Sequence, residues 1–102
     1  MKLLIITALK EYSDQAAALL KKAEIHVFSA TDISGFKDGS SHNLLDDWFT
    51  AGEARFDSVL VFSFTTEEKA AAALKLIEEY NHSLAEDFPL RAFIVPVDNF
   101  SK

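Results

Sequence analysis

Three segments of this chain have the length of β-strands and are apolar at most positions: residues 2–9 (KLLIITAL), 57–65 (DSVLVFSFT) and 90–97 (LRAFIVPV). A strand with one face in water alternates apolar and polar side chains. These segments do not alternate: Leu3 and Ile5 fall on one face of the first strand, and Leu4 and Ile6 on the other. The sequence therefore predicts a sheet that is covered on both faces.

Two segments with helical periodicity separate the predicted strands. The first helix is indicated by apolar side chains at offsets of four, seven, eight and eleven, namely Tyr12, Ala16, Leu19, Leu20 and Ala23, with Ser13 as a possible N-cap. The second begins at a capping-box pattern, Thr65-x-x-Glu68, and runs to about residue 83. Residues 24–33 (EIHVFSATDI) are rich in β-branched and aromatic side chains and predict the remaining strand.

The order of elements is strand, helix, strand, a long connection at residues 34–56, and a second strand, helix and strand. This order predicts an α+β, ferredoxin-like βαβ-βαβ sandwich: a four-stranded antiparallel sheet with two helices on one face. Residues 1–102 then form a single domain. A small open parallel sheet is the less favoured alternative.

The predicted helices cover one face of the sheet and leave the other uncovered, although both faces are apolar. Soluble monomers rarely expose an apolar patch of more than a few hundred Å², so we expect the second face to be an interface between copies of the chain. The alternative is that residues 34–56 fold back over it, with Leu44, Leu45, Trp48 and Phe49 as the cover.

Composition excludes several classes of function. The formal net charge of −6 argues against nucleic acid as a partner. It also argues against more than a peripheral role at a membrane, because nucleic acids and anionic membranes both attract proteins with clustered Lys and Arg. No apolar run reaches the roughly 20 residues of a membrane span, so we expect a cytoplasmic protein. The absence of cysteine excludes disulfides, thiolate catalysis and Cys-ligated metals. No grouping of residues has a spacing that favours catalysis, so the sequence predicts no enzyme.

The chain resembles the PII-like superfamily, which comprises the nitrogen regulatory protein P-II and its relatives. The resemblance lies in KLLIITAL, in LLKKAEI, and above all in HVFSATDISGFKDG, which is similar to the PII segment where a strand leads through Gly-Phe-Gly into the long T-loop. The second half, from VLVFSF to LRAFIVPV, matches in order and spacing. Only Gly35-Phe36 is motif-like.

The resemblance implies a homotrimer, a PII-like signalling protein that regulates a partner such as a membrane transporter through its T-loop. It also implies ATP or ADP in the clefts between subunits. By position, Gly35, Phe36 and Lys37 would form the base of the T-loop and residues 38–55 the loop itself. Together with Arg91, those three residues are the candidate ligand-binding residues.

The sequence departs from the family where PII proteins hold phosphate. Residues 81–90 (NHSLAEDFPL) contain no glycine and no lysine, and Glu86 and Asp87 would repel a triphosphate. The second glycine of the motif is Lys37, and Arg91 is the remaining cation next to this stretch. The identity of any cofactor therefore stays open, and a small anionic ligand other than ATP is the alternative that the sequence leaves.

The long connection carries two further candidates. Leu44, Leu45, Trp48 and Phe49 resemble an amphipathic anchor for a protein partner. His42, Asp46 and Asp47 are weak candidates for a shared metal, because an ordinary solvated surface or the start of a helix explains these residues better. The alternatives to a regulator are a small-molecule or metal-binding trimer of ferredoxin-like fold, similar to CutA, and a small enzyme of that fold.

Overall fold

A computed structural model describes residues 1–36, 55–83 and 89–101 of the chain. It confirms the predicted α+β, ferredoxin-like layout. The elements in chain order are β1 (Lys2–Leu9), the 3-10 turn η1 (Lys10–Tyr12), α1 (Ser13–Lys22), β2 (Ser29–Phe36), β3 (Arg55–Thr65), α2 (Glu67–Ser83) and β4 (Arg91–Pro96).

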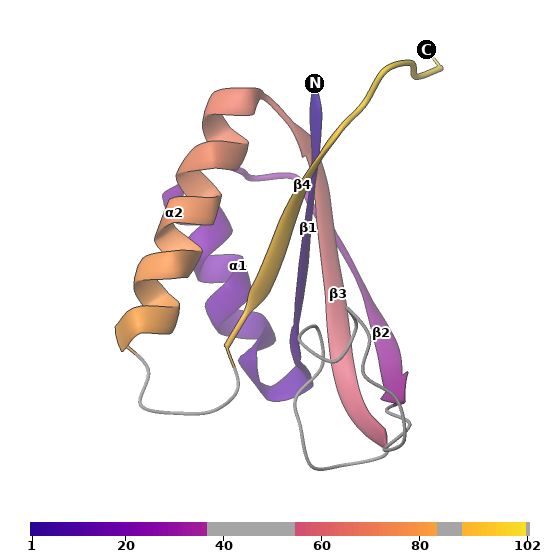
Figure 1. The fold of residues 1–102 in the computed structure, drawn as a ribbon, viewed down its shortest axis with the longest axis vertical. Coiled ribbons are helices and arrows are strands. Elements are labelled where there is room, and N and C mark those ends of the chain that lie inside the picture. The colour runs from indigo at the N-terminus through magenta and orange to yellow at the C-terminus, as the bar shows by residue number, and fades with distance from the viewer. Residues whose placement is uncertain (37–54, 84–88, 102) are drawn as a thin grey trace.

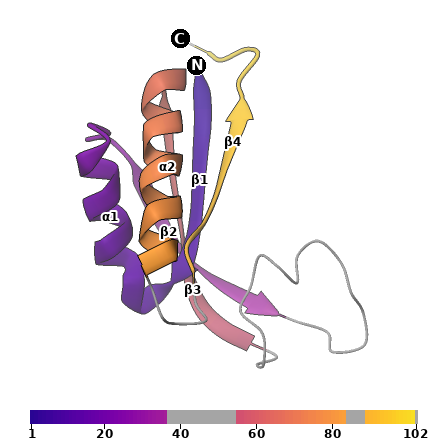
Figure 2. The ribbon, with the colours of Figure 1, turned by 60° about the vertical axis from the view of Figure 1, so that its left-hand side comes forward.

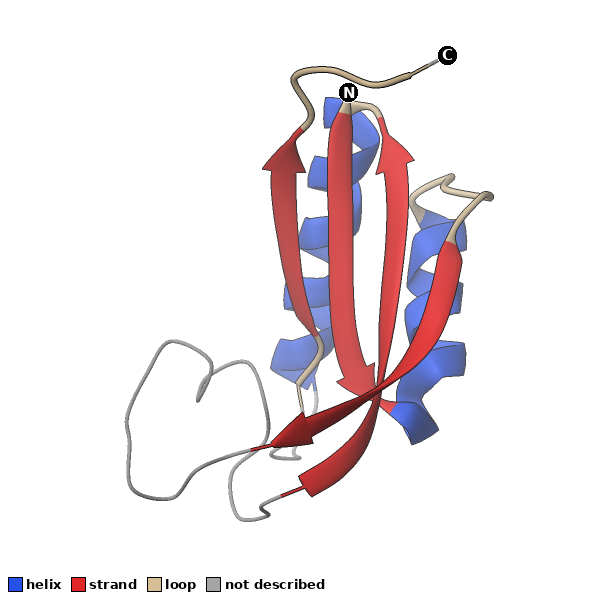
Figure 3. Ribbon diagram, turned by 90° about the vertical axis from the view of Figure 1, so that its right-hand side faces the viewer, coloured by secondary structure: helices blue, strands red, loops and turns tan. Residues whose placement is uncertain are grey.

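The sheet has the strand order β2-β3-β1-β4, and every pair of neighbours is antiparallel. β4 lies at an edge of the sheet, which explains why Pro96 is tolerated at its end. Both helices pack on the same side of the sheet, so the opposite side faces the viewer without a helix in front of it in Figure 3. Figures 1 and 2 show the same two layers from the side.

The core lies between the helices and one face of the sheet. Its members are buried aliphatic side chains from β1, β3 and the two helices: Leu4, Ile6, Ala8, Ala16, Leu20, Val59, Val61, Ala73 and Ile77. Small alanines on the buried faces of both helices let the helix backbones approach the sheet, while leucine and isoleucine fill the space between. Leu90, at the start of β4, closes the same core.

The first helix ends at a residue whose backbone has a left-handed conformation. Glu24 has φ 63°, the N–H of Ile25 donates to the Leu20 carbonyl at 2.9 Å, and the N–H of Glu24 donates to the Lys21 carbonyl at 3.0 Å. This pair of bonds is a Schellman cap, which normally places glycine at the left-handed position. The prediction that a strand begins at residue 24 is therefore wrong: residues 24–28 form the cap and a link, and β2 begins at Ser29.

Three other features differ from the sequence prediction. Ser13 is not the N-cap of the first helix but the first residue of α1, and Tyr12 stands at the cap position. The cap of α2 is Thr66 and not Thr65, because the Thr66 Oγ1 accepts a hydrogen bond from the N–H of Lys69 at 3.3 Å. The long connection is shorter than the predicted 34–56, because backbone pairing continues to Phe36 on β2 and from Arg55 on β3. Residues 37–54, which hold most of the predicted T-loop, lie outside the described residues.

The left-handed residue predicts a stabilising substitution. Glu24→Gly is expected to raise the free energy of unfolding by about 1 kcal/mol, because glycine adopts this backbone conformation without the steric cost of a Cβ atom. Urea denaturation followed by circular dichroism measures the change. The matched control is Lys22→Gly, two residues earlier at the last position of α1, which should lower stability by a similar amount. A destabilised Glu24→Gly variant would contradict the assignment of the cap.

Candidate functional site

The side of the sheet away from the helices, here called the open face, is built from the alternate residues of each strand. Because Leu4, Ile6 and Ala8 point into the core, their neighbours on β1 point the other way. The register then assigns the open face to Leu3, Ile5, Thr7 and Leu9 on β1, Leu60, Phe62 and Phe64 on β3, Arg91, Phe93 and Val95 on β4, and Thr31 and Ile33 on β2.

One end of the open face is apolar and partly exposed. Phe64 on β3 and Val95 on β4 flank Leu3, and their exposed fractions are 57% and 39%. Phe62 and Phe93 flank Ile5 in the next row, and Phe93 is 43% exposed. The rings of Phe62 and Phe64 meet edge to face with centroids 6.4 Å apart. We call these six residues the apolar end; none of them carries a charge.

The third row of the open face is polar. Thr7 lies in register between Leu60 and Arg91. Its side chain is 97% buried, since only 3% of the residue is exposed, and its Oγ1 has no hydrogen-bond partner. Arg91 beside it is exposed. Burying a hydroxyl without a hydrogen-bond partner costs free energy of folding. The row therefore contains one unsatisfied hydroxyl, and next to it the exposed guanidinium of Arg91.

The position of Arg91 is fixed by a side chain of α2. The Asn81 side chain donates from Nδ2 to the Leu90 carbonyl at 2.8 Å and accepts from the Leu90 N–H at Oδ1 at 2.9 Å. These two bonds have the donor and acceptor pattern of two paired strand residues, and they hold Leu90, the residue just before β4, in place. Asn81 therefore fixes the backbone from which Arg91 projects.

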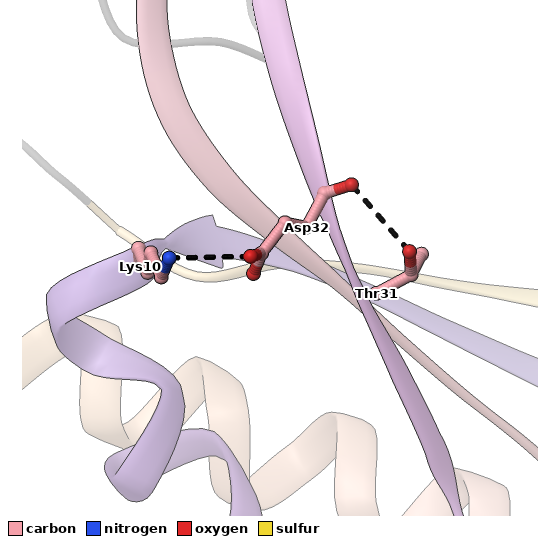
Figure 4. Close-up of polar contacts among 3 residues, drawn as sticks. All are labelled: Lys10, Thr31 and Asp32. Carbon is pink, nitrogen blue, oxygen red and sulfur yellow. Dashed lines mark hydrogen bonds and ion pairs between the residues drawn. The ribbon is translucent and has the colours of Figure 1, made fainter.

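A small polar pocket lies on the helix side of the sheet, where β2 and β3 extend past η1. It has a volume of about 200 Å³ and is lined by Lys10, Asp32, Ile33, Ser34, Asp57 and Ser58. The Lys10 Nζ pairs with the Asp32 Oδ2 at 3.2 Å (Figure 4). Both side chains are mostly exposed, so the ion pair contributes at most about 1 kcal/mol. With two carboxylates and one ammonium, this pocket does not favour an anion.

Figure 4 also shows a contact between neighbours on β2, in which the Thr31 Oγ1 lies 3.5 Å from the Asp32 carbonyl oxygen. This distance is at the limit for a hydrogen bond. The contact therefore adds little to the position of Asp32, which the ion pair with Lys10 determines.

The residues predicted for a ligand site are only partly described. Gly35 and Phe36 form the last backbone pairs of β2, opposite Phe56 and Arg55, and Arg91 begins β4. Lys37 lies outside the described residues, as do the partner-loop residues Leu44, Leu45, Trp48 and Phe49 and the weak metal candidates His42, Asp46 and Asp47.

Sequence reasoning missed Thr7 and Asn81. Alternation along the strand places Thr7 on the same face as Leu3 and Ile5, but nothing in the sequence signals that its hydroxyl lacks a partner. Asn81 was included in the stretch before the last strand, and an asparagine near the end of a helix is too common to single out. Both roles depend on contacts across the fold.

Two classes of site find no support in the part of the chain that is described. Among these residues, no three His, Asp or Glu side chains gather where they could hold a metal ion. No helix in the same ranges is both long and apolar enough to cross a membrane.

The unpaired hydroxyl predicts a second stabilising substitution. Thr7→Val keeps the shape of the side chain and removes the polar group, so the free energy of unfolding is expected to rise by about 1 kcal/mol. Thermal or urea unfolding measures this change. Thr31→Val on the exposed edge strand is the control and should have little effect. Loss of stability in Thr7→Val would show that the hydroxyl has a partner in solution.

Comparison with known proteins gives a match in structure and none in sequence. No family model matches the chain, and neither does any curated protein. Among solved structures, the chain is similar to CPII, a nitrogen regulatory PII-like protein from Thiomonas intermedia K12, bound to ADP, AMP and bicarbonate. The TM-score is 0.61 at 16% identity, over 98% of this chain and 94% of that one. The chain therefore has the fold of a PII-like protein.

Proposed function

We propose that this protein is a PII-like regulator that assembles through the open face of its sheet, as a homotrimer, and controls a protein partner. The observation that carries the proposal is the open face itself. Its apolar end exposes large parts of Phe64, Phe93 and Val95, although no helix covers this side. Association of copies removes such a surface from water.

The structural similarity to CPII supports a regulatory role in place of catalysis. The match covers 98% of this chain and 94% of CPII. CPII is bound to ADP, AMP and bicarbonate, and a regulator of this kind would report a bound small molecule to its partner. We place the reporting element at residues 37–54, between β2 and β3.

The connection at residues 37–54 would bind the partner through apolar side chains of the connection. Leu44, Leu45, Trp48 and Phe49 remain the candidates from the sequence, because aromatic anchors contribute most to protein interfaces. A cytoplasmic location, and a membrane transporter as the regulated partner, belong to the same proposal.

A second function, ligand sensing, is favoured by the polar row of the open face. A small anion would meet the exposed Arg91 guanidinium, and the Thr7 hydroxyl next to it is buried, so it would reach the anion only if neighbouring side chains moved. If copies associate as proposed, this row lies near their contact, and Gly35, Phe36 and Lys37 would complete the cleft. The alternatives are a small-molecule or metal-binding trimer similar to CutA and a small enzyme, and binding experiments separate them from the regulator.

The assembly is tested by placing a charge on the open face. Light scattering of the wild-type protein at micromolar concentration should give three times the 11.3 kDa mass of one chain. Phe64→Lys should weaken association by tenfold or more, because the new ammonium would lose its water in the contact. A monomeric wild-type protein contradicts the proposal.

The control for this experiment adds the same charge on the other side of the molecule. Ala72 is exposed on α2, on the helix side of the sheet. Ala72→Lys should leave the mass unchanged. If it dissociates the assembly as much as Phe64→Lys does, the contact does not lie on the open face.

Ligand sensing is tested by calorimetry with AMP, ADP, ATP and bicarbonate. We expect heat of binding with AMP or bicarbonate and none with ATP, because Glu86 and Asp87 repel a triphosphate. Arg91→Ala should weaken the binding tenfold or more, since it removes a charge-assisted hydrogen bond. Lys75→Ala, at an exposed position of α2, is the control. Absence of heat with all four compounds contradicts ligand sensing and leaves the assembly proposal standing.

A further inference from the structure

The segment after β4, here called the tail (residues 97–101), leaves the body of the molecule. The N–H of Val97 donates to the Met1 carbonyl at 3.3 Å and continues the pairing with the first strand for one step. Beyond this bond the tail runs past the end of the sheet, on the side away from the helices (Figure 1). Figure 3 shows it beyond the ends of the strands, above the sheet.

The tail carries a large apolar side chain into water. Phe100 is 59% exposed, a fraction as large as that of Phe64. A phenylalanine side chain buries on the order of 200 Å² when it is fully covered, so about half of that area is available on each ring. Exposed aromatic rings of this size at one end of a small molecule are typical of an interaction surface.

The tail and the apolar end of the open face lie at the same end of the sheet. The first residue of β1, Lys2, pairs with Thr65 on β3 and Pro96 on β4. The next residue, Leu3, pairs with Phe64 and Val95 of the apolar end. The tail begins directly after Pro96. One chain thus presents an exposed apolar side chain and an exposed apolar surface next to each other, and neither covers the other.

We infer that the tail of one copy packs on the apolar end of the open face of a second copy, with Phe100 against Phe64 and Val95. The inference rests on the proposed assembly through the open face and adds the element that fixes its geometry. Each copy gives one tail and receives another, and such a head-to-tail contact closes into a ring when its rotation permits.

Charge favours a second copy of this chain as the occupant. Each copy carries a net charge of −6, so copies repel one another wherever their charged surfaces approach. The six side chains of the apolar end carry no charge, and neither does Phe100. Asp98 is the one charged residue of the tail, so two copies can touch here with few like charges in contact.

Sedimentation velocity over a concentration series tests the role of the tail. Phe100→Ala is expected to raise the dissociation constant of the assembly about tenfold, and it should fold normally because the ring is exposed. The matched control is Val27→Ala, which shortens a side chain that is 84% exposed on the link between α1 and β2. It should leave the dissociation constant unchanged. An unchanged constant in Phe100→Ala, or an equal loss in Val27→Ala, overturns the inference.

Photochemical cross-linking identifies the surface that the tail meets. A benzophenone analogue of phenylalanine is placed at position 100, and equal amounts of isotopically light and heavy protein are mixed before irradiation. We expect mixed light and heavy cross-links from position 100 to the tryptic peptide of residues 56–69, which contains Phe64. Cross-links only within chains of one isotope would show that the tail covers its own face, and they overturn the inference.

The two experiments separate this inference from the proposed function. If the wild-type protein assembles, Phe64→Lys dissociates it and Phe100→Ala does not, the assembly through the open face stands and the role of the tail fails. If the wild-type protein is a monomer at all concentrations, both fail. If both variants dissociate and the cross-links join different copies, both are supported.

Discussion

The structure depends on one imbalance: a sheet that is apolar on both sides and has helices on one side only. The helix side buries Leu4, Ile6, Val59 and Val61 against α1 and α2, which is sufficient for a core in a chain of this length. The other side repeats the same kind of residue, and no helix of the described ranges lies over it. Everything we propose about assembly follows from this second apolar surface.

The open face is not uniform, and its rows differ in the chemistry that they offer for the two roles proposed above. Two rows at one end hold Leu3, Ile5 and aromatic neighbours, which suit contact with another copy. The next row holds Thr7 and Arg91, which suit a polar ligand. Because adjacent strands hold these rows in register, assembly and binding would occur within a few residues of each other.

Much of the fold could be predicted from the sequence. Apolar runs, helical periodicity and the order of the elements gave the antiparallel sheet and both helices, and the resemblance to PII-like proteins agrees with the structural match. The boundary errors have a local cause. A glutamate at the left-handed position of a cap gives no sequence signal of the kind that glycine gives, so the strand after α1 was placed too early.

The sequence by itself determined that the chain forms a sheet with apolar residues on both faces, because side chains alternate along a strand whatever its neighbours are. Tertiary structure alone decided which residues share a row. Arg91 and Thr7 are far apart in the sequence, and antiparallel pairing brings them together while Asn81 holds the start of β4 in place. The unmet hydroxyl of Thr7 likewise exists only after folding, because burial, and not the residue type, removes its water.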